Sequence, residues 1–318
     1  MTVDEAIQLF LQACEFEQNL TILTLAAYSS DLHQFLDSVS ARGSQIDEAL
    51  TSDALRAHVF KLKRTLCLQD SSIRRKIAVL KRFAAFLEQR DMIAENPFRK
   101  ARFSYRQTCR IPRVLNREEV TAILNAVKAS LKAETICELQ SGRISKTSFV
   151  VLRDNALLEL LFYTGARVGE VVQLNVDDCD LSGGYLRLNG KGRRDRVISL
   201  GCAPVIDALK LYLRARSNVQ AAGPALFVSV RGHRLSVYSM ESRVAMYGAS
   251  AGIQRKVTPH RLRHTMATMM LENGADLRTV QEILGHTSIR TTQVYTHISS
   301  EQRRRAMSQY HPRNLFWF

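Results

Sequence analysis

Residues 284–297 read Leu-Gly-His-Thr-Ser-Ile-Arg-Thr-Thr-Gln-Val-Tyr-Thr-His, which places Tyr295 nine residues after a Gly-His pair. Three earlier stretches carry charged side chains: Gly-Ala-Arg-Val-Gly-Glu at 165–170, Gly-Lys-Gly-Arg at 190–193 and Thr-Pro-His-Arg-Leu-Arg-His at 258–264. Among their side chains are two arginines, a lysine, two histidines and a late tyrosine that could act together: Arg167, Arg263, Lys191, His260, His286 and Tyr295. Metal-free attack of a tyrosine on a phosphodiester needs that set of side chains.

Tyr295 is the candidate nucleophile. A phosphotyrosyl bond stores the energy of the phosphodiester, so resealing needs neither ATP nor a cofactor. Arg167 and Arg263 are the candidate phosphate clamps, because a guanidinium donates paired hydrogen bonds to phosphate oxygens and stays charged at any working pH. The ordinary alternatives are a packing tyrosine and surface ion pairs. Glu170 follows Arg167 by three residues and either orients it or is an exposed helix residue.

The two candidate histidines would handle protons or bind the phosphate. His260 and Arg263 lie three residues apart on a helix that Thr258 caps and Pro259 opens. That spacing predicts both on one face near the helix N-terminus, where the helix dipole favours an anion. His260 would move the proton of the tyrosine, and His286, in a tight loop, is predicted to have a similar role.

The basic loop after residue 189 is predicted to lie between two strands. A lysine ammonium such as that of Lys191 can reach the leaving oxygen and donate a proton to it. Spacing alone leaves open which basic residue of this loop is the acid. Arg193, Arg194 and Arg196 are expected to bind the DNA backbone instead.

Composition favours a polyanionic partner. The 318 residues, 46% of them apolar, carry a net charge of +15, which points to nucleic acid, with loose contact to RNA or acidic lipid as the alternative. No run of 18 apolar residues and no signal peptide are visible, so no membrane partner is expected. Six scattered cysteines argue against a zinc or disulfide framework. We expect a cytoplasmic, nucleoid-associated protein without metal or cofactor.

Residues 1–100 are predicted to form a small, all-helical domain. Thr2-Val-Asp-Glu5 fits a capping box that begins the first helix. The clearest helix carries apolar residues at alternating intervals of four and three from Ile73 to Leu87, with Ser71 or Ser72 as its cap. A basic strip beside its apolar face is predicted to contact DNA, unless it is only a solvated surface. The strip consists of Arg74, Arg75, Lys81 and Arg82.

Residues 101–113 are predicted to be a linker, and residues 114–318 a second, catalytic domain. Asn116-Arg-Glu-Glu119 predicts its first helix, with a capping box. Residues 128–148 are predicted to be an insertion or loop. Strands are expected at Tyr185–Leu188 and Arg196–Leu200, with helices from there to about residue 310.

The order and spacing of these motifs resemble the tyrosine recombinase (integrase) family, most closely its Xer-like members. The resemblance is strongest over 155–200 and 258–312 and moderate over 20–98. It assigns the general acid to the lysine of the strand turn, Lys191. The chain departs from the Xer-like pattern at 128–148 and in its apolar end. A role in chromosome-dimer resolution is therefore in doubt, and a transposon, plasmid or phage-type element stays open.

The resemblance also implies an architecture and partners. It implies a mainly α-helical chain, with an N-terminal helical, SAM-like core-binding domain and a C-terminal α+β catalytic domain with a small sheet, closing as a C-shaped clamp on duplex DNA. Four protomers would assemble on paired half-sites, exchange strands through a 3′-phosphotyrosyl bond and a Holliday junction, and each bury its C-terminal tail in a neighbour. The apolar residues 315–318 fit that use, and an accessory protein is left open.

Three other interpretations compete with this one. A type IB topoisomerase uses the same tyrosine chemistry to relax DNA, and a DNA-binding protein of the same fold could lack activity. A metal-dependent nuclease needs clustered carboxylates, and Asp177, Asp178 and Asp180 are the only tight group. They are predicted to form a turn before the hairpin rather than a metal site.

Overall fold

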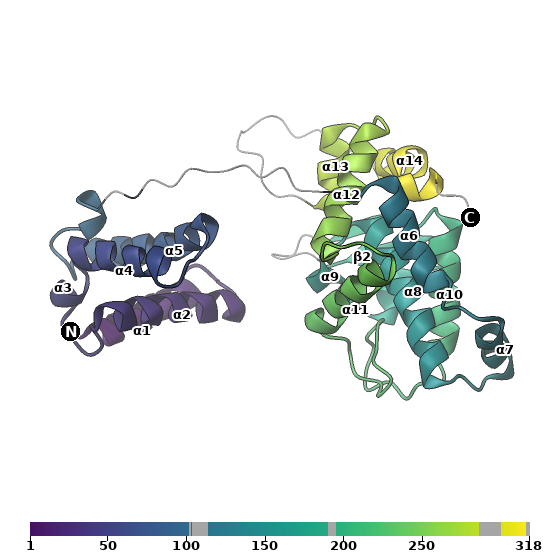
Figure 1. The fold of residues 1–318 in the computed structure, drawn as a ribbon, viewed down its shortest axis with the longest axis horizontal. Coiled ribbons are helices and arrows are strands. Elements are labelled where there is room, and N and C mark those ends of the chain that lie inside the picture. The colour runs from purple at the N-terminus through teal and green to yellow at the C-terminus, as the bar shows by residue number, and fades with distance from the viewer. Residues whose placement is uncertain (102, 104–113, 190–194, 286–299, 316–318) are drawn as a thin grey trace. The chain divides into compact units, whose positions relative to one another are not determined.

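The computed structural model describes residues 1–101, 103, 114–189, 195–285 and 300–315. Over these residues the chain is mainly helical with one small sheet, as predicted (Figure 1). It divides into two compact units, unit 1 (Met1–Arg110) and unit 2 (Ile111–Phe318). No helix in the described part of the chain is long and apolar enough to cross a membrane.

Unit 1 is a helical bundle. Its first helix begins with the predicted capping box: the Thr2 hydroxyl accepts from the Glu5 amide at 3.3 Å, and the Glu5 carboxylate accepts from the Thr2 amide at 2.8 Å. Phe10 lies in the core, with its ring centroid 5.4 Å from those of Phe83 and Phe86. The elements are α1 (Val3–Phe16), α2 (Ile22–Val39), α3 (Ile46–Ala49), α4 (Ser52–Arg64), α5 (Asp70–Gln89) and η1 (Pro97–Arg99).

Unit 2 combines helices with the sheet. Its first helix begins with the predicted capping box of Asn116 and Glu119. The elements are α6 (Arg117–Lys128), α7 (Ala133–Ser141), α8 (Lys146–Thr164), α9 (Val168–Gln173), η2 (Val176–Asp178), β1 (Cys179–Asp180), β2 (Tyr185–Leu188), β3 (Arg196–Ser199), α10 (Ala203–Arg216), α11 (Val237–Ser250), α12 (Pro259–Glu272), α13 (Leu277–Leu284), α14 (Ser300–Tyr310) and η3 (Pro312–Leu315).

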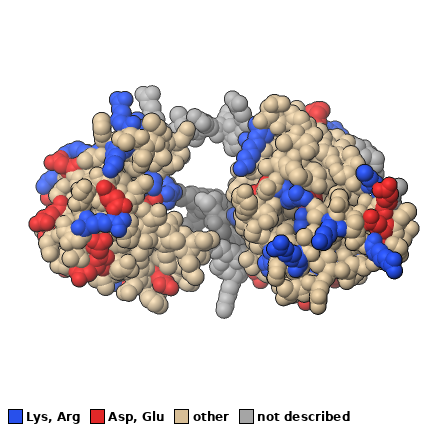
Figure 2. All heavy atoms as spheres, turned by 60° about the horizontal axis from the view of Figure 1, so that its bottom comes forward, with Lys and Arg blue, Asp and Glu red and all other residues tan. Residues whose placement is uncertain are grey.

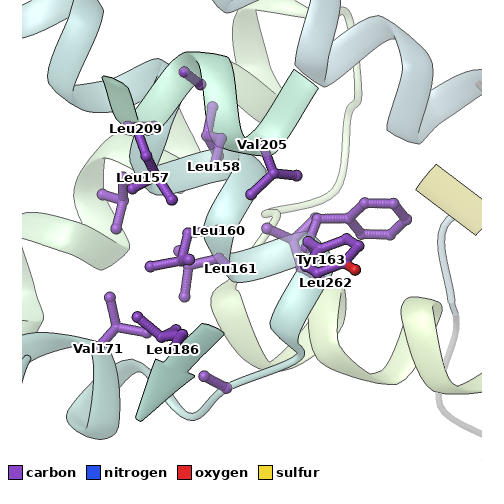
Figure 3. Close-up of a cluster of buried hydrophobic side chains, with 14 of the residues drawn as sticks. Leu157, Leu158, Leu160, Leu161, Tyr163, Val171, Leu186, Val205, Leu209 and Leu262 are labelled. Atoms are coloured by element: carbon purple, nitrogen blue, oxygen red, sulfur yellow. The ribbon is translucent and has the colours of Figure 1, made fainter. Parts of the chain in front are cut away.

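Helix α8 is the centre of unit 2. Almost every residue from Ser148 to Thr164 is buried, as expected for a helix that is covered on all sides. Helices α6, α10 and α12 pack around it (Figure 1). Figure 3 shows the leucines of α8 clustered with Val171 of α9, Leu186 of β2 and Val205 of α10. This rigid core fixes the turn that follows α8, which carries the first candidate site residue.

The sheet is antiparallel in the order β1-β2-β3. Leu186 of β2 lies opposite Ile198 of β3, and both side chains are buried. The two predicted strands are confirmed. Because side chains alternate along a strand, Arg196 shares the inward face of Ile198 rather than the exposed face of Val197, which is 51% exposed. The predicted loop between β2 and β3 lies outside the described residues at 190–194.

Two local predictions need correction. Of the two alternatives for residues 128–148, an insertion or a loop, the loop is wrong, because the segment contains α7, whose Leu139 is buried and which packs against α10. The helix is short, since Gly142 ends it with φ +71°, and so its periodicity is weak. Helix α5 begins at Asp70 with Gln69 in the cap position, so Ser71 and Ser72 lie inside the first turn and do not cap it.

We expect a buried histidine to make unit 1 sensitive to acid. His58 is fully buried, with its Nδ1 2.5 Å from the Ser38 hydroxyl and its ring edge-on to Phe35. Burial, together with the positive charges of Lys76 and Lys61, lowers the pKa of His58 to about 4. An unfolded histidine titrates near 6.5, so the unfolded state binds more protons between these two values.

We therefore expect stability to fall as the pH drops from about 6.5 toward 4, by up to about 1.4 kcal/mol per pH unit from this group. In His58→Gln the fall is expected to be shallower, because the replaced side chain does not titrate. Urea unfolding of the full chain at several pH values measures both slopes. Identical pH dependence in the two proteins would rule out His58 as a source of the acid sensitivity.

Candidate active site

The N-terminus of α12 carries two of the predicted residues. The Thr258 hydroxyl caps the helix by accepting from the Arg261 amide at 3.2 Å, and Pro259 is its first residue, as predicted. His260 is exposed in the first turn. Arg263 is only 4% exposed, so the two side chains do not share a solvent-facing surface.

Arg263 joins two distant segments through backbone carbonyls. Its Nη1 donates to the Gly165 carbonyl at 2.5 Å, and its Nη2 donates to the Leu284 carbonyl at 2.8 Å. Burial, then the nearby positive charge of Arg167, lowers the pKa of Arg263 to about 10. The guanidinium therefore stays cationic at neutral pH. Because it is buried, its electrostatic attraction to a nearby anion is stronger than it would be in water.

Gly165 ends α8 in a conformation that leaves no room for a side chain. Its φ is +57°, and a Cβ atom there would lie 2.1 Å from the Met266 Cε and 2.8 Å from the Leu284 Cδ2. The turn is thereby pressed against α12 and α13. This close approach brings the next residues of the chain, including Arg167, to the end of α13.

Arg167 is the cap residue of α9, and Glu170 orients it as the sequence suggested. The Glu170 carboxylate accepts from the Arg167 amide at 2.8 Å and from its Nη1 at 2.9 Å. The Arg167 side chain is 44% exposed, and its Nη2 lies 3.4 Å from the Gly285 carbonyl. Burial alone would raise the pKa of Glu170, but hydrogen bonds and charge from Arg196 and Arg167 outweigh it and lower the pKa.

Arg196 belongs to this cluster, although the sequence suggested a DNA-backbone contact for it. Its Nη1 and Nη2 donate to the two carboxylate oxygens of Glu170 at 3.1 and 2.8 Å, and its Nε donates to the Ile283 carbonyl at 3.0 Å. Its side chain is 13% exposed. The signal that could have found it is the strand alternation, which puts Arg196 on the buried face of β3 with Ile198.

Three guanidinium groups thus converge on the C-terminal end of α13. Arg196 and Arg263 bond to its last two carbonyls, and Arg167 approaches the next one. A helix C-terminus has unpaired carbonyls and a partial negative charge, which cations satisfy. The structure therefore gathers fixed positive charge immediately before the segment that the sequence predicts to hold the nucleophile.

The remaining predicted site residues lie outside the described residues. Their neighbours along the chain are nonetheless placed: the basic loop ends one residue before Arg196, and residue 286 follows directly after Gly285. The predicted residues concerned are Lys191, Arg193, Arg194, His286 and Tyr295.

The basic strip of α5 is partly engaged within unit 1. Arg75 donates to both oxygens of Asp31 at 2.5 and 2.8 Å, and Lys76 donates to the same carboxylate at 2.7 Å. Asp31 is only 2% exposed, so these bonds compensate a buried charge. Arg74 is half-buried.

The other half of the strip packs on aromatic rings. Arg82 donates to the Tyr28 hydroxyl at 2.7 Å and to the Gln18 side chain, and its guanidinium lies over the Tyr28 ring. The Lys81 ammonium lies 5.7 Å from the centroid of the Phe98 ring. Both residues are exposed, so these contacts hold the side chains in place and still leave them accessible to solvent.

Figure 2 shows how charge is spread over one face of each unit. On unit 2, at the right, basic side chains gather in the middle of the face and acidic ones are fewer. Unit 1, at the left, shows both signs. This distribution agrees with net charges of −7 over 1–60, +10 over 61–112 and +12 over 113–318. Residues after about residue 60 therefore dominate attraction of a polyanion.

The aspartate group forms turns, as predicted. The Asp178 carboxylate accepts from the Asn175 amide at 2.9 Å. The Asp180 carboxylate accepts from the Ser182 and Gly183 amides at 2.9 and 2.7 Å. Both carboxylates are thus used to cap the bends that lead into β1 and β2, as expected for aspartates in turns.

Known proteins resemble the chain along nearly its whole length. Residues 113–302 match the phage integrase family, and residues 7–91 match the phage integrase N-terminal SAM-like domain. Tyrosine recombinase XerC of Pelobacter propionicus is 35% identical over 309 residues, which cover 97% of this chain and 96% of the relative.

Solved structures share the fold. The XerH site-specific recombinase bound to its difH substrate, in a pre-cleavage complex, has a TM-score of 0.66 at 23% identity, covering 95% of this chain and 83% of that one. A lambda integrase tetramer bound to a Holliday junction has a TM-score of 0.63 at 16% identity, covering 93% and 81%. With a family match over more than half of its residues and a relative 35% identical along almost all of them, this chain belongs to the phage integrase family of tyrosine recombinases.

Proposed function

We propose that the chain is a site-specific recombinase that cuts and rejoins duplex DNA with Tyr295 as its nucleophile. The observation that carries the proposal is the cluster of Arg167, Arg196 and Arg263 at the end of α13. The chain's membership of a recombinase family supports it further.

The phosphate would be held by Arg167 and Arg263. The Tyr295 hydroxyl attacks the phosphorus, the bond from phosphorus to the 5′ oxygen breaks, and a 3′-phosphotyrosyl bond forms. Charge that builds on the non-bridging oxygens is stabilised by the guanidinium groups, whose positions the carbonyl bonds and Glu170 already fix. Attack by a 5′ hydroxyl of the partner strand reverses the step and reseals the DNA.

Protons would pass through the remaining candidates. His260 and His286 accept the phenolic proton or bind the phosphate, and Lys191 donates a proton to the leaving 5′ oxygen. His260 is exposed at the start of α12, where a bound DNA backbone can reach it. The proton count balances, since one proton leaves the phenol and one reaches the leaving oxygen.

The substrate and assembly follow from the same proposal. Four chains would act on two DNA sites and exchange strands through a Holliday junction, with units 1 and 2 closing on the duplex as a C-shaped clamp. The lambda integrase tetramer on a Holliday junction has this fold, which supports the proposal. Integration, excision and dimer resolution all use such an exchange, including on a mobile element.

The C-terminal tail is proposed to join neighbouring chains. In the single chain, the Arg313 Nε and Nη2 donate to the Glu159 carboxylate at 2.6 and 2.7 Å, and both side chains are fully buried. If the tail crosses to a neighbour, Arg313 meets the Glu159 of that neighbour and the same ion pair is kept, as in a domain swap.

The α5 strip is proposed to contribute to DNA affinity through Arg74, Arg75, Lys81 and Arg82. Replacing Arg74 and Lys81 by Gln leaves the Arg75–Asp31 pair intact, so it tests the strip without exposing a buried charge. We expect the slope of log affinity against log salt to become shallower by about 0.9 for each phosphate that the strip no longer binds. Unchanged affinity and slope would mean that the strip is a solvated surface.

A plasmid assay tests the proposed reaction. A duplex selected from a random pool by binding to the protein is placed in two copies on a supercoiled plasmid. Recombination yields two circles whose sizes the site positions set. Relaxed circles alone would show strand relaxation instead, and binding without any change in the plasmid would indicate a silent DNA-binding protein.

A further inference from the structure

Arg196 is bound too fully within the candidate site to serve the DNA backbone as well. All three of its guanidinium nitrogens donate to protein acceptors, two to Glu170 and one to the Ile283 carbonyl. Three of its five N–H groups are used, its side chain is 13% exposed, and its charge is paired with the Glu170 carboxylate. Arg196 therefore has less to offer a phosphate than Arg263, whose bonds go only to neutral carbonyls.

The close packing at the end of α13 fits this arrangement. Gly285 caps the helix with φ +66°, and a Cβ atom there would lie 3.0 Å from the Arg196 Nη1. The absence of a side chain lets the guanidinium lie across the helix end. The negative end of the helix dipole and the Glu170 carboxylate both face it, so its charge is balanced on two sides.

We propose that Arg196 is a positioning residue for DNA cleavage, an inference that rests on the proposed recombinase function. It ties the end of α13, three residues before His286, to the Glu170 carboxylate that orients Arg167. It acts through these groups and does not touch the phosphate. Its position thereby sets the distance between the phosphate clamp and the start of the nucleophile-bearing segment.

Arg196→Lys tests this role. Lysine keeps the charge but cannot span Glu170 and the Ile283 carbonyl with a rigid fork. We expect the rate of covalent adduct formation on a nicked duplex, selected by binding to the wild-type protein, to fall by about 10²-fold, as a small misplacement of reacting groups does. The DNA dissociation constant is expected to stay within about twofold, because Arg196 does not bind the phosphate.

Arg216→Lys is the matched control. Arg216 is also half-buried and donates to two carbonyls, of Ala225 at 3.0 Å and Gly223 at 3.1 Å, in a loop that holds no candidate site residue. The Arg216→Lys variant should lose about as much thermal stability as Arg196→Lys and keep the wild-type cleavage rate. If both variants lose the same fraction of activity, the effect of Arg196 is general destabilisation and the proposal is overturned.

Two further readouts exclude a purely structural role. If Arg196 and Glu170 act as a unit, Arg196→Lys combined with Glu170→Gln costs about as much in cleavage rate as the worse single change, while independent effects would multiply.

A substrate with sulfur in place of the leaving 5′ oxygen needs no proton donor. It should leave the Arg196→Lys defect in place. If sulfur restored the cleavage rate, Arg196 would act by helping the basic loop at 190–194 to donate the proton. The proposed link to α13 would then be overturned.

Adduct formation by the wild-type protein distinguishes failure of the recombinase proposal from failure of the positioning role of Arg196. If wild-type protein forms no adduct with any duplex that it binds, the recombinase proposal itself fails. If wild-type protein forms the adduct and Arg196→Lys matches its rate, only the positioning role fails.

Discussion

Arg263→Lys is expected to lower the rate of covalent adduct formation by about 10²- to 10³-fold, as removal of one transition-state donor does elsewhere. Arg263 is 4% exposed and spans the Gly165 and Leu284 carbonyls. Lysine can carry the charge but cannot hold both carbonyls and also present a fork to the phosphate. Single-turnover cleavage of a nicked duplex measures the rate.

Binding and stability must be measured beside that rate. The DNA dissociation constant of Arg263→Lys is expected to change by less than about threefold, because only transition-state stabilisation is removed. Arg216→Lys again reports the cost of losing comparable carbonyl bonds away from the site. A cleavage loss below tenfold in a folded, DNA-binding Arg263→Lys protein would remove Arg263 from the phosphate clamp.

Arg313→Met is expected to destabilise unit 2 by about 3–5 kcal/mol, because it leaves the buried Glu159 carboxylate without its main partner. Both side chains have 0% exposure in this pair, and the Lys128 ammonium, 3.8 Å from the carboxylate, replaces only part of the missing attraction. Urea unfolding monitored by circular dichroism gives the free energy of unfolding.

The double variant Arg313→Met with Glu159→Leu is the matched control. It removes the buried charge together with its partner, so it should recover much of the stability that the single change loses. A loss below about 1 kcal/mol in Arg313→Met would mean that Glu159 is compensated by other groups, and it would weaken the case for tail docking through this pair.

Local sequence signals predicted much of the fold. The capping boxes at Thr2 and Asn116 form as expected, because each depends on residues within one helical turn. The Thr258 cap was predicted for the same reason, and the two strands were predicted from short segments that flank a turn. The missing cap of α5 and the unexpected α7 show the limit of such signals: helix boundaries depend on packing as well as on capping residues.

The sequence singled out Arg167, Glu170 and Arg263 by residue type, but it did not predict most of the contacts that the structure gives them. The bond between Arg167 and Glu170 is local and was anticipated. The position of Arg196 depends on the Ile283 carbonyl of α13, 87 residues away, and on which face of β3 it occupies. The burial of Arg263 likewise depends on α8 and α13 meeting at Gly165, which no spacing in the sequence encodes.

Trapping the covalent intermediate tests the central claim most directly. Wild-type protein and Tyr295→Phe are incubated with nicked duplexes of a selected binding site and separated under denaturing conditions, with Tyr238→Phe, an exposed tyrosine of α11, as the control. The account predicts a protein–DNA adduct with wild type and Tyr238→Phe and none with Tyr295→Phe, although all three bind the duplex equally. An adduct that persists in Tyr295→Phe, or none with a wild-type protein that binds the site tightly and selectively, would contradict it.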